Sequence, residues 1–379
     1  MTLDLQEVGR KLKRYREQLQ LTVPEVAAAT GIPGPRLERF ESGTVAPSGD
    51  EILILADNYK CDYRFFVSNE RRAPFEQTEN LYRRYGGEFS KSDRWSVQEF
   101  LFLCECEEFL VRELKRSRTN FSFTPSGSYF KGHAERASSE LRRTLGYAET
   151  SVPVDVYSDF RKLGIHVFRR RLENSNISGL TVRHPYAGPC VLVNYSEDVY
   201  RQRFTAAHEA GHAILDGDDD VIVSFTQWDR KDLVEIRANT FASLYLLPPS
   251  VILKLPVSAW DRANMVRWAD KLRVNTTALA IALKENAVID MATFEYLKRV
   301  SISPEQKVDP ELVGLTSRSL ERKRHLLERG LSSHYVALCL DAMAENRITA
   351  ARAAEMLLVS EGDLSELASL FGVKLLVHD

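Results

Sequence analysis

Apolar residues between positions 6 and 68 recur at the three- and four-residue spacing of amphipathic helices. The first helix that this spacing predicts has an apolar stripe made of Val8, Leu12, Tyr15 and Leu19. Thr22 and Glu25 have the spacing of a capping box, which predicts the start of a second helix. A turn at Gly31 leads into a third helix over residues 33–40, and a fourth is expected over 51–59. Two helices joined by a glycine turn are the pattern of a helix-turn-helix unit.

A later apolar run, residues 203–212, contains the pattern H-E-x-x-H. On a helix, His208 and His212 lie four residues apart on one face, so both can offer imidazole nitrogens to one metal ion. Glu209 follows His208 directly, where its carboxylate can take a proton from a water on that metal. Zinc prefers such ligands and keeps one position open for water, so the pattern predicts metal-assisted peptide hydrolysis. The alternative is a helix with two partly buried histidines and a surface glutamate.

A second helix with 3.6-residue periodicity is predicted downstream, over residues 232–244, and it ends before Pro248. Glu235 lies near its start, where a carboxylate can complete a His-His-Glu site. Asn239 follows one turn later and can orient one of the metal-binding side chains by a hydrogen bond, without touching the metal itself. The alternative for Glu235 is a solvated acid favoured by the helix dipole, with Asp232 as the substitute ligand.

The residue patterns of the other segments predict linkers and packed helices. Residues 70–90 are polar and arginine-rich, and residues 118–128 are rich in turn formers, so both are expected to be linkers. Residues 92–114 predict a long amphipathic helix whose apolar stripe serves as core or as a dimer seam. The acidic run 216–220 is interpreted as a solvated loop, or else as a feature that attracts a basic substrate segment. Residues 325–376 predict a small helical unit.

Composition is that of an ordinary globular protein, with 44% hydrophobic and 27% charged residues among 379. The net charge of −2 gives no global attraction to nucleic acid or membrane. The first residues lack the apolar stretch of a secretory signal, and no run of eighteen apolar residues suggests a membrane span. Five scattered cysteines without a C-x-x-C pair suit reduced thiols. We therefore expect a cytoplasmic protein with no membrane partner.

The region from about 134 to 249 resembles the ImmA/IrrE family of metallopeptidases. The resemblance rests on residues 152–156, 163–167, 190–194, 201–205, 208–212, 235, 238–239, 241–242 and 246–248. It implies that His208, His212 and Glu235 bind Zn²⁺ and that Glu209 is the catalytic base. The chain departs from the family at Ala210, where an aliphatic residue is common, and at Arg237, where an acid is frequent. Neither is expected to touch the metal ligands.

The N-terminal unit resembles the XRE, or lambda-repressor-like, helix-turn-helix family. The resemblance rests on Ala27, Gly31, Ile32, Leu37, Glu41-Ser42-Gly43, Pro47 and the helix from Leu53 to Ala56. It implies that the third helix enters the major groove of DNA. Arg36 and Arg39 would then reach guanine edges or phosphates, beside Gly34 and Pro35, which replace the polar residues that usually contact bases.

A basic cluster on the first helix offers further phosphate contacts, although a charged helix face is usually only solvated. Its members are Arg10, Lys11, Lys13, Arg14 and Arg16.

Together these patterns predict a mainly α protein with a small β-sheet, of α+β class. The expected units are an all-α helix-turn-helix domain (1–69), a linker with a long helix (70–130), a zincin-like zinc metallopeptidase domain (131–255), a helical extension (256–300) and a C-terminal helical domain (301–379). Tyr195, Arg203 and His184 are candidate oxyanion donors. The strand at 191–194 is a candidate for substrate binding by strand addition.

The leading hypothesis is a cytosolic zinc endopeptidase fused to a DNA-binding domain, acting as a transcriptional regulator. The family resemblance implies that its substrate is a helix-turn-helix repressor cleaved after DNA damage or phage-related stress. DNA, this repressor and a second copy of the chain are the expected partners. Two alternatives remain open. In one, a DNA-binding transcription factor uses the peptidase-like domain as a non-catalytic sensor. In the other, a protease uses its N-terminal unit for protein docking.

Overall fold

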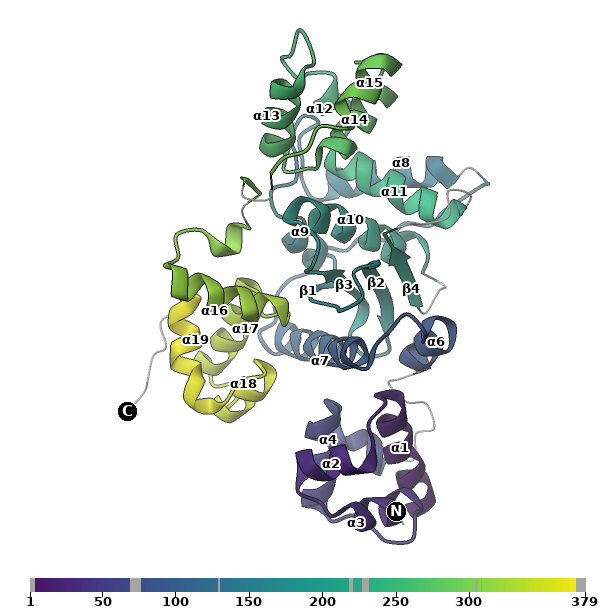
Figure 1. Cartoon of the computed structure of the whole chain (residues 1–379), viewed down its shortest axis with the longest axis vertical. Helices are drawn as coiled ribbons and strands as arrows, with labels where there is room; N and C mark the ends of the chain where they lie inside the picture. The colour runs from purple at the N-terminus through teal and green to yellow at the C-terminus, as the bar shows by residue number, and fades with distance from the viewer. Residues whose placement is uncertain are drawn as a thin grey trace.

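The computed structural model describes residues 4–68, 76–128, 130–217, 221–226, 232–303, 306–307 and 309–372. Helices dominate these residues, and four short strands form a small mixed sheet (Figure 1). The α+β class predicted from the sequence is therefore confirmed. Every helix in the described ranges is too short or too polar to cross a bilayer.

The N-terminal unit has its own hydrophobic core, shown in purple at one end of the molecule in Figure 1. Its helices are α1 (Leu5–Gln18), α2 (Val23–Thr30), α3 (Gly34–Glu41), α4 (Gly49–Tyr59) and α5 (Tyr63–Val67). The predicted capping box is present, since the Thr22 side chain accepts from the Glu25 backbone and the Glu25 carboxylate accepts from the Thr22 backbone. Gly31 ends α2 at φ +73°, a conformation that glycine adopts without strain.

Two helices follow this unit, α6 (Glu76–Tyr85) and α7 (Lys91–Glu113). The long helix predicted over 92–114 is α7. The expectation of a linker over 70–90 is wrong for residues 76–85, because Leu81 is fully buried and gives α6 an apolar anchor. Further along α6, the ring of Tyr85 lies 5.9 Å from that of Phe225 on the sheet. Residues 69–75 lie outside the described ranges.

The sheet has the strand order β1-β3-β2-β4, with β1 parallel to β3 and the other pairs antiparallel. The strands are β1 (His166–Arg170), β2 (Ile177–His184), β3 (Gly188–Asn194) and β4 (Val221–Phe225). The segment 191–194, predicted as a site for strand addition, lies in β3. That prediction is wrong, because β1 and β2 occupy both edges of β3 and leave its backbone no free hydrogen-bonding edge.

The two faces of the sheet belong to two different cores, as the two-residue period of a strand requires. On β3, Val191 and Val193 face one core, whereas Cys190 and Leu192 face the other. Helix α10 (Val199–Leu215) covers the first face and α7 covers the second (Figure 1).

The core on the α10 side continues into the remaining helices of the peptidase region and its extension. These are α8 (Phe130–Thr144), α9 (Val156–Lys162), α11 (Leu233–Leu246), α12 (Pro249–Ile252), α13 (Arg262–Leu272), α14 (Thr276–Glu285) and α15 (Met291–Leu297).

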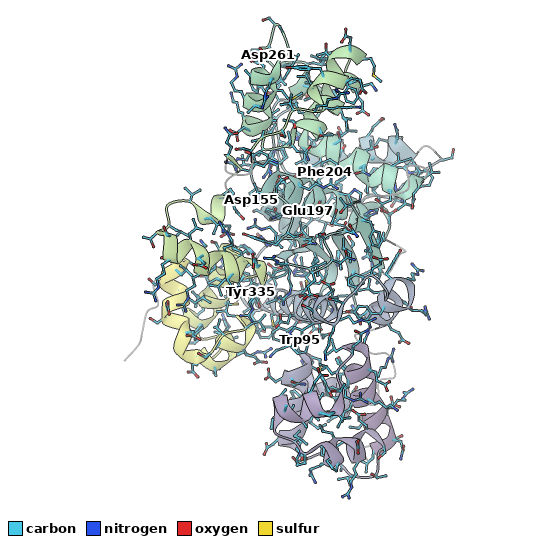
Figure 2. The ribbon with its side chains drawn as sticks, in the orientation of Figure 1. Trp95, Asp155, Glu197, Phe204, Asp261 and Tyr335 are labelled. Atoms are coloured by element: carbon cyan, nitrogen blue, oxygen red, sulfur yellow. The ribbon has the colours of Figure 1, made fainter. Side chains whose placement is uncertain are left out.

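The core on the α7 side is completed by the C-terminal helices. They are η2 (Pro310–Leu312), α16 (Ser317–Glu328), α17 (Ser333–Ala344), α18 (Ala350–Met356), η3 (Glu361–Asp363) and α19 (Leu364–Leu370). Tyr335 of α17, labelled in Figure 2, meets the ring of Phe168 on β1 edge to face at 5.4 Å. The apolar stripe of α7 therefore serves as core within one chain. The limits of the units and a homodimer stay predictions.

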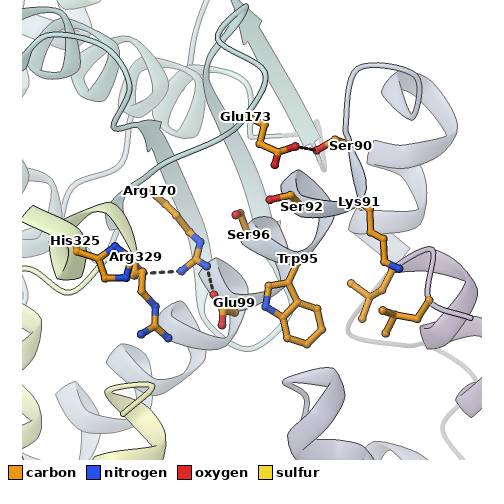
Figure 3. Close-up of a pocket in the computed structure, with 12 residues that line it drawn as sticks. Ser90, Lys91, Ser92, Trp95, Ser96, Glu99, Arg170, Glu173, His325 and Arg329 are labelled. Carbon is orange, nitrogen blue, oxygen red and sulfur yellow. Dashed lines mark hydrogen bonds and ion pairs between the residues drawn. The ribbon is translucent and has the colours of Figure 1, made fainter. Parts of the chain in front are cut away.

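The helix-turn-helix unit meets α7 through polar contacts around one aromatic side chain. Trp95 packs against the N-terminal core, and Lys91 forms an ion pair with Glu25. Arg94 and Gln98 donate to backbone carbonyls of the N-terminal unit at 3.0 and 2.9 Å. A cavity of about 860 Å³ lies beside this junction (Figure 3).

Candidate metal centre

The H-E-x-x-H sequence forms the middle of α10, which begins at the N-cap Asp198. Alanines and one glycine surround the two histidines, so the helix packs closely against its neighbours, and almost all of its residues are buried. His212 and Glu209 are fully buried, and His208 is 6% exposed. This burial sets the centre apart from a surface helix on which the same sequence would be solvated.

Helix α11 brings Glu235 to the same place from a different part of the chain. Asp232 caps this helix by accepting from the backbone of Val234 and Glu235, so its carboxylate is engaged away from the histidines. Glu235 lies in the first turn of the helix, and its side chain is 12% exposed. Burial acts to raise the pKa of Glu235, but the contacts with His208 and His212 outweigh it and lower that pKa to about 2.

Three donor atoms converge with the spacing of a metal site. The Nε2 atoms of His208 and His212 are 3.0 Å apart, and the Glu235 oxygens lie 3.3 and 3.4 Å from them. Bonds of about 2.05 Å in a tetrahedral shell would place neighbouring ligand atoms about 3.3 Å apart. The donor set of two imidazoles and one carboxylate also matches catalytic zinc sites. The residues present therefore fit a zinc ion.

Glu209 lies beside these donors with one carboxylate oxygen held and the other free. Thr181 on β2 donates to Oε2 at 2.7 Å. Oε1 is buried and has no hydrogen-bond partner among the described residues. Burial raises the pKa of Glu209, against the effect of the charges on His208 and His212. A buried acceptor without a partner is costly, so this oxygen favours a further hydrogen-bond donor.

Gly179 on β2 makes room for Glu209, a role that the sequence analysis missed. A Cβ at position 179 would lie 2.9 Å from both Cγ and Oε1 of Glu209. The pairing of β2 with β4 also shifts register between Ile177 and Gly179, and such irregularities re-aim side chains beside functional sites. No sequence pattern marked this position, because the neighbour that excludes a side chain is 30 residues away.

His212 is oriented by a chain of two further side chains. Its Nδ1 lies 2.7 Å from Asp216 Oδ2, and the other Asp216 oxygen forms an ion pair with Arg237. The interpretation of Asp216 as part of a solvated loop is therefore wrong, and residues 218–220 of that loop lie outside the described ranges. A carboxylate behind a ligating histidine fixes its ring and tautomer. The four-residue spacing from His212 was a signal that could have revealed it.

Arg237 reaches the centre only through this chain, and it does not touch the three donors. Its guanidinium also lies 4.8 Å from the ring centre of Phe130 on α8. The residue that departs from the family pattern thus neutralises the carboxylate behind His212.

Two further polar side chains lie near the donors. The Asn239 amide donates to the backbone carbonyl of Glu235 at 2.9 Å, so its observed contact is with the helix backbone. Ser224 on β4, which the sequence analysis missed, has its hydroxyl 3.2 Å from His208 Nε2.

The three candidate oxyanion donors have other partners. Arg203 donates to the carbonyls of Pro153, Val154 and Arg273. His184 lies 3.0 Å from Glu105 on α7, on the opposite face of the sheet, and Tyr195 lies beside Arg169. Their contacts do not support that role.

The exposed face of α3 carries the residues expected to contact DNA. Pro35, Arg36 and Arg39 are exposed and Gly34 is half-buried. Arg36 is held by Glu51 through two contacts, of 2.5 and 3.0 Å, so part of its charge is neutralised within the unit. Arg39 has no carboxylate within ion-pair distance among the described residues.

The basic cluster on α1 is engaged within the protein. Arg16 forms a two-point ion pair with Glu41, and Lys11 donates to two backbone carbonyls. Arg10, Lys13 and Arg14 each have a carboxylate partner. These contacts match a helix face whose charges are balanced internally.

Replacing Asp216 by Asn should weaken zinc binding about 10- to 100-fold, because His212 loses the carboxylate that orients it. Zinc affinity is measured by competition with a chelating dye, with thermal unfolding as the check on folding. The control is Asp50→Asn, an exposed acid on α4. Equal zinc affinity in the wild type and Asp216→Asn would contradict the orienting role.

Comparison with known proteins adds two family matches and one relative. Residues 160–284 match a peptidase family described as the IrrE N-terminal-like domain, and residues 7–63 match a helix-turn-helix domain family. The radiation response metalloprotease IrrE of Deinococcus radiodurans is 39% identical over 69 residues. That alignment covers 17% of this chain and 21% of the relative. The chain thus carries an IrrE-like peptidase domain behind an N-terminal helix-turn-helix domain.

Proposed function

We propose that this chain is a zinc-dependent endopeptidase fused to a DNA-binding unit and that it acts as a transcriptional regulator. The observation that carries the proposal is the convergence of His208, His212 and Glu235, all within 4.8 Å of one another, beside the buried carboxylate of Glu209. Two imidazoles, a carboxylate and an adjacent base are the parts that metal-assisted peptide hydrolysis requires.

A zinc ion held by these three residues would act as a Lewis acid that polarises a peptide carbonyl and makes water more acidic. Glu209 would accept the proton of the attacking water at Oε1, the oxygen that has no partner within the described chain. Thr181 holds the other oxygen, so the carboxylate keeps one orientation. The same group would then deliver the proton to the leaving amine.

The outer strand β4 is the proposed binding edge for an extended substrate. β4 pairs with β2 on one side, and among the described residues it has no strand on the other. Ser224 of this strand lies beside His208, so a peptide added along β4 would pass the candidate centre.

The proposed substrate is a helix-turn-helix repressor whose cleavage relieves repression under DNA damage or related stress. Support comes from the relative, whose name describes a radiation response metalloprotease, and from the helix-turn-helix match in the same chain. The N-terminal unit would bring the protease to the DNA where such a repressor is bound.

One observation favours a second candidate, in which the N-terminal unit docks protein instead of DNA. Arg36 is paired with Glu51, and the α1 cluster is internally engaged, so few cations remain for phosphate. The sensor alternative predicts instead that regulation survives the loss of Glu209.

Replacing Glu209 by Gln should lower proteolysis at least about 100-fold while zinc stays bound near one per chain, because the base is lost and the ligands remain. Peptides with new N-termini are compared by mass spectrometry in cells expressing wild type, Glu209→Gln or the surface control Glu285→Gln. Cleavage products that persist in Glu209→Gln would rule out the general-base role. Unchanged regulation without cleavage would favour the sensor.

Replacing Gly179 by Ala should also reduce proteolysis with zinc retained, because the added methyl displaces the Glu209 carboxylate. The matched control is Gly49→Ala on α4, where a Cβ meets nothing within 4 Å. Activity is read in the same cleavage assay and metal content by mass spectrometry. Full activity in Gly179→Ala would show that Glu209 does not need this space.

Replacing Arg36 and Arg39 by Ala should weaken binding to the protein's own promoter DNA and reduce its dependence on salt, because phosphate or base contacts are lost. Fluorescence anisotropy at several salt concentrations gives both quantities. Arg267→Ala, on the distant helix α13, is the control. Binding without sequence preference in the wild type would favour the docking alternative.

A further inference from the structure

A second large cavity lies away from the candidate metal centre. Its volume is about 750 Å³, and its walls come from the α9 and α10 region, the end of α13, and the C-terminal helices α16 and α17. Asp155, which is labelled in Figure 2, lines it on the side of the peptidase region that faces the C-terminal helices.

The acidic side chains in its walls all have hydrogen-bond or ion-pair partners, those of Asp155 and Asp270 being neutral donors. Asp309 is paired with Arg169 at 2.5 Å, and Asp270 accepts from the Tyr200 hydroxyl at 2.5 Å. Glu311 accepts from the backbone and hydroxyl of Ser333, and Asp155 caps α9.

Two of the arginines that line the cavity, Arg203 and Arg273, have no carboxylate partner among the described residues. Arg203 is 5% exposed, and its three hydrogen bonds go to neutral backbone carbonyls. Among the described residues no carboxylate lies within ion-pair distance of Arg203 or Arg273. Burial lowers the pKa of Arg203; the nearby charge of Arg273 acts in the same direction, and Tyr157 and Asp155 oppose it. Arg203 is thus a buried cation without an ion-pair partner among the described residues, which is costly, and its surroundings favour an anion.

Tyr157, which also lines this cavity, carries a hydrogen-bond donor that is unused within the described residues. The hydroxyl of Tyr157 is buried and has no partner among the described residues. A phenol can donate to an oxyanion, and guanidinium groups match the geometry of phosphate oxygens. Among the described residues, Arg203 and Arg273 therefore offer two charges without an ion-pair partner, and Tyr157 offers a hydroxyl without a hydrogen-bond partner.

The cavity has space for more than an inorganic ion. Its volume lies within the range of small-molecule sites, roughly 300–1,000 Å³. Val154, Val199 and Leu327 add apolar wall beside the polar groups. A ligand with one charged group and an organic part would fill it.

In the cavity beside the helix-turn-helix junction, by contrast, the lining cations Arg170 and Lys91 are paired with carboxylates. There the buried Arg170 is paired with Glu99 and also donates to the Arg329 carbonyl (Figure 3). Lys91 at its other side is paired with Glu25. Its buried charge is therefore satisfied within the protein.

We propose that the cavity lined by Arg203, Arg273 and Tyr157 is a binding site for a small molecule that carries a phosphate group. The two arginines bind the phosphate oxygens, the Tyr157 hydroxyl donates to one of them, and the organic part lies against the apolar wall. Because Arg203 and His208 are on the same helix, the ligand contacts the element that carries the candidate metal centre. Binding does not depend on proteolysis.

Inorganic phosphate is the probe for this site. Thermal unfolding of the full chain is followed as sodium phosphate is added, with sodium chloride at matched ionic strength as the comparison. We expect a saturable rise in Tm with phosphate and no such rise with chloride. No saturable effect of phosphate, or an equal effect of chloride, would overturn the proposal.

Two substitutions locate the bound phosphate without removing a side-chain hydrogen bond or ion pair seen among the described residues. Tyr157→Phe deletes only the hydroxyl that has no partner and should weaken phosphate binding about 5-fold. Arg273→Gln keeps the backbone carbonyl that holds Arg203 and should weaken binding at least about tenfold. Tyr296→Phe, an exposed tyrosine on α15, and Arg267→Gln are the matched controls. Unchanged affinity in both cavity variants would show that the ion binds elsewhere.

Discussion

The close approach of helix α10 to the sheet and to α11 sets the geometry on which the candidate centre depends. Small residues make this approach possible at both surfaces. A Cβ on Gly211 would lie 3.0 Å from the Phe241 ring on α11, and one on Gly179 would lie 2.9 Å from Glu209. With larger residues at these two positions, α10 would move outward. Its histidines would then no longer reach the carboxylate that α11 supplies.

Because the residues around the centre are buried, each charged side chain there needs a hydrogen-bond or ion-pair partner. Asp216 lies between His212 and Arg237, so that a buried carboxylate has both a donor and a counterion. Glu209 keeps one oxygen without a partner in the described chain, at the place where the proposed mechanism needs a proton acceptor. On the same helix, Arg203 has only carbonyl partners. Along α10, the Glu209 oxygen without a partner and the Arg203 guanidinium without a carboxylate are the groups to which we assign proton transfer and ligand binding.

The two cores on opposite faces of the sheet explain how distant segments form one peptidase region. The C-terminal helices close the core under α7, and α7 carries the contacts to the helix-turn-helix unit. That junction contains Trp95 and polar contacts such as those of Arg94 and Gln98 with backbone carbonyls. The N-terminal unit therefore keeps a core of its own, and α7 and α6 connect it to the sheet.

The sequence by itself determined the features that depend on local periodicity. The capping box at Thr22, the apolar stripe of α7 and the four-residue spacing of the two histidines follow from helical repeat, and the structure contains each of them. The family resemblance pointed to Glu235, but only packing brings its carboxylate within 3.4 Å of the histidines. Tertiary structure alone decided the space at Gly179, the central place of β3 and the unmatched arginines of the second cavity. Those features depend on neighbours far apart in the chain, which no local pattern records.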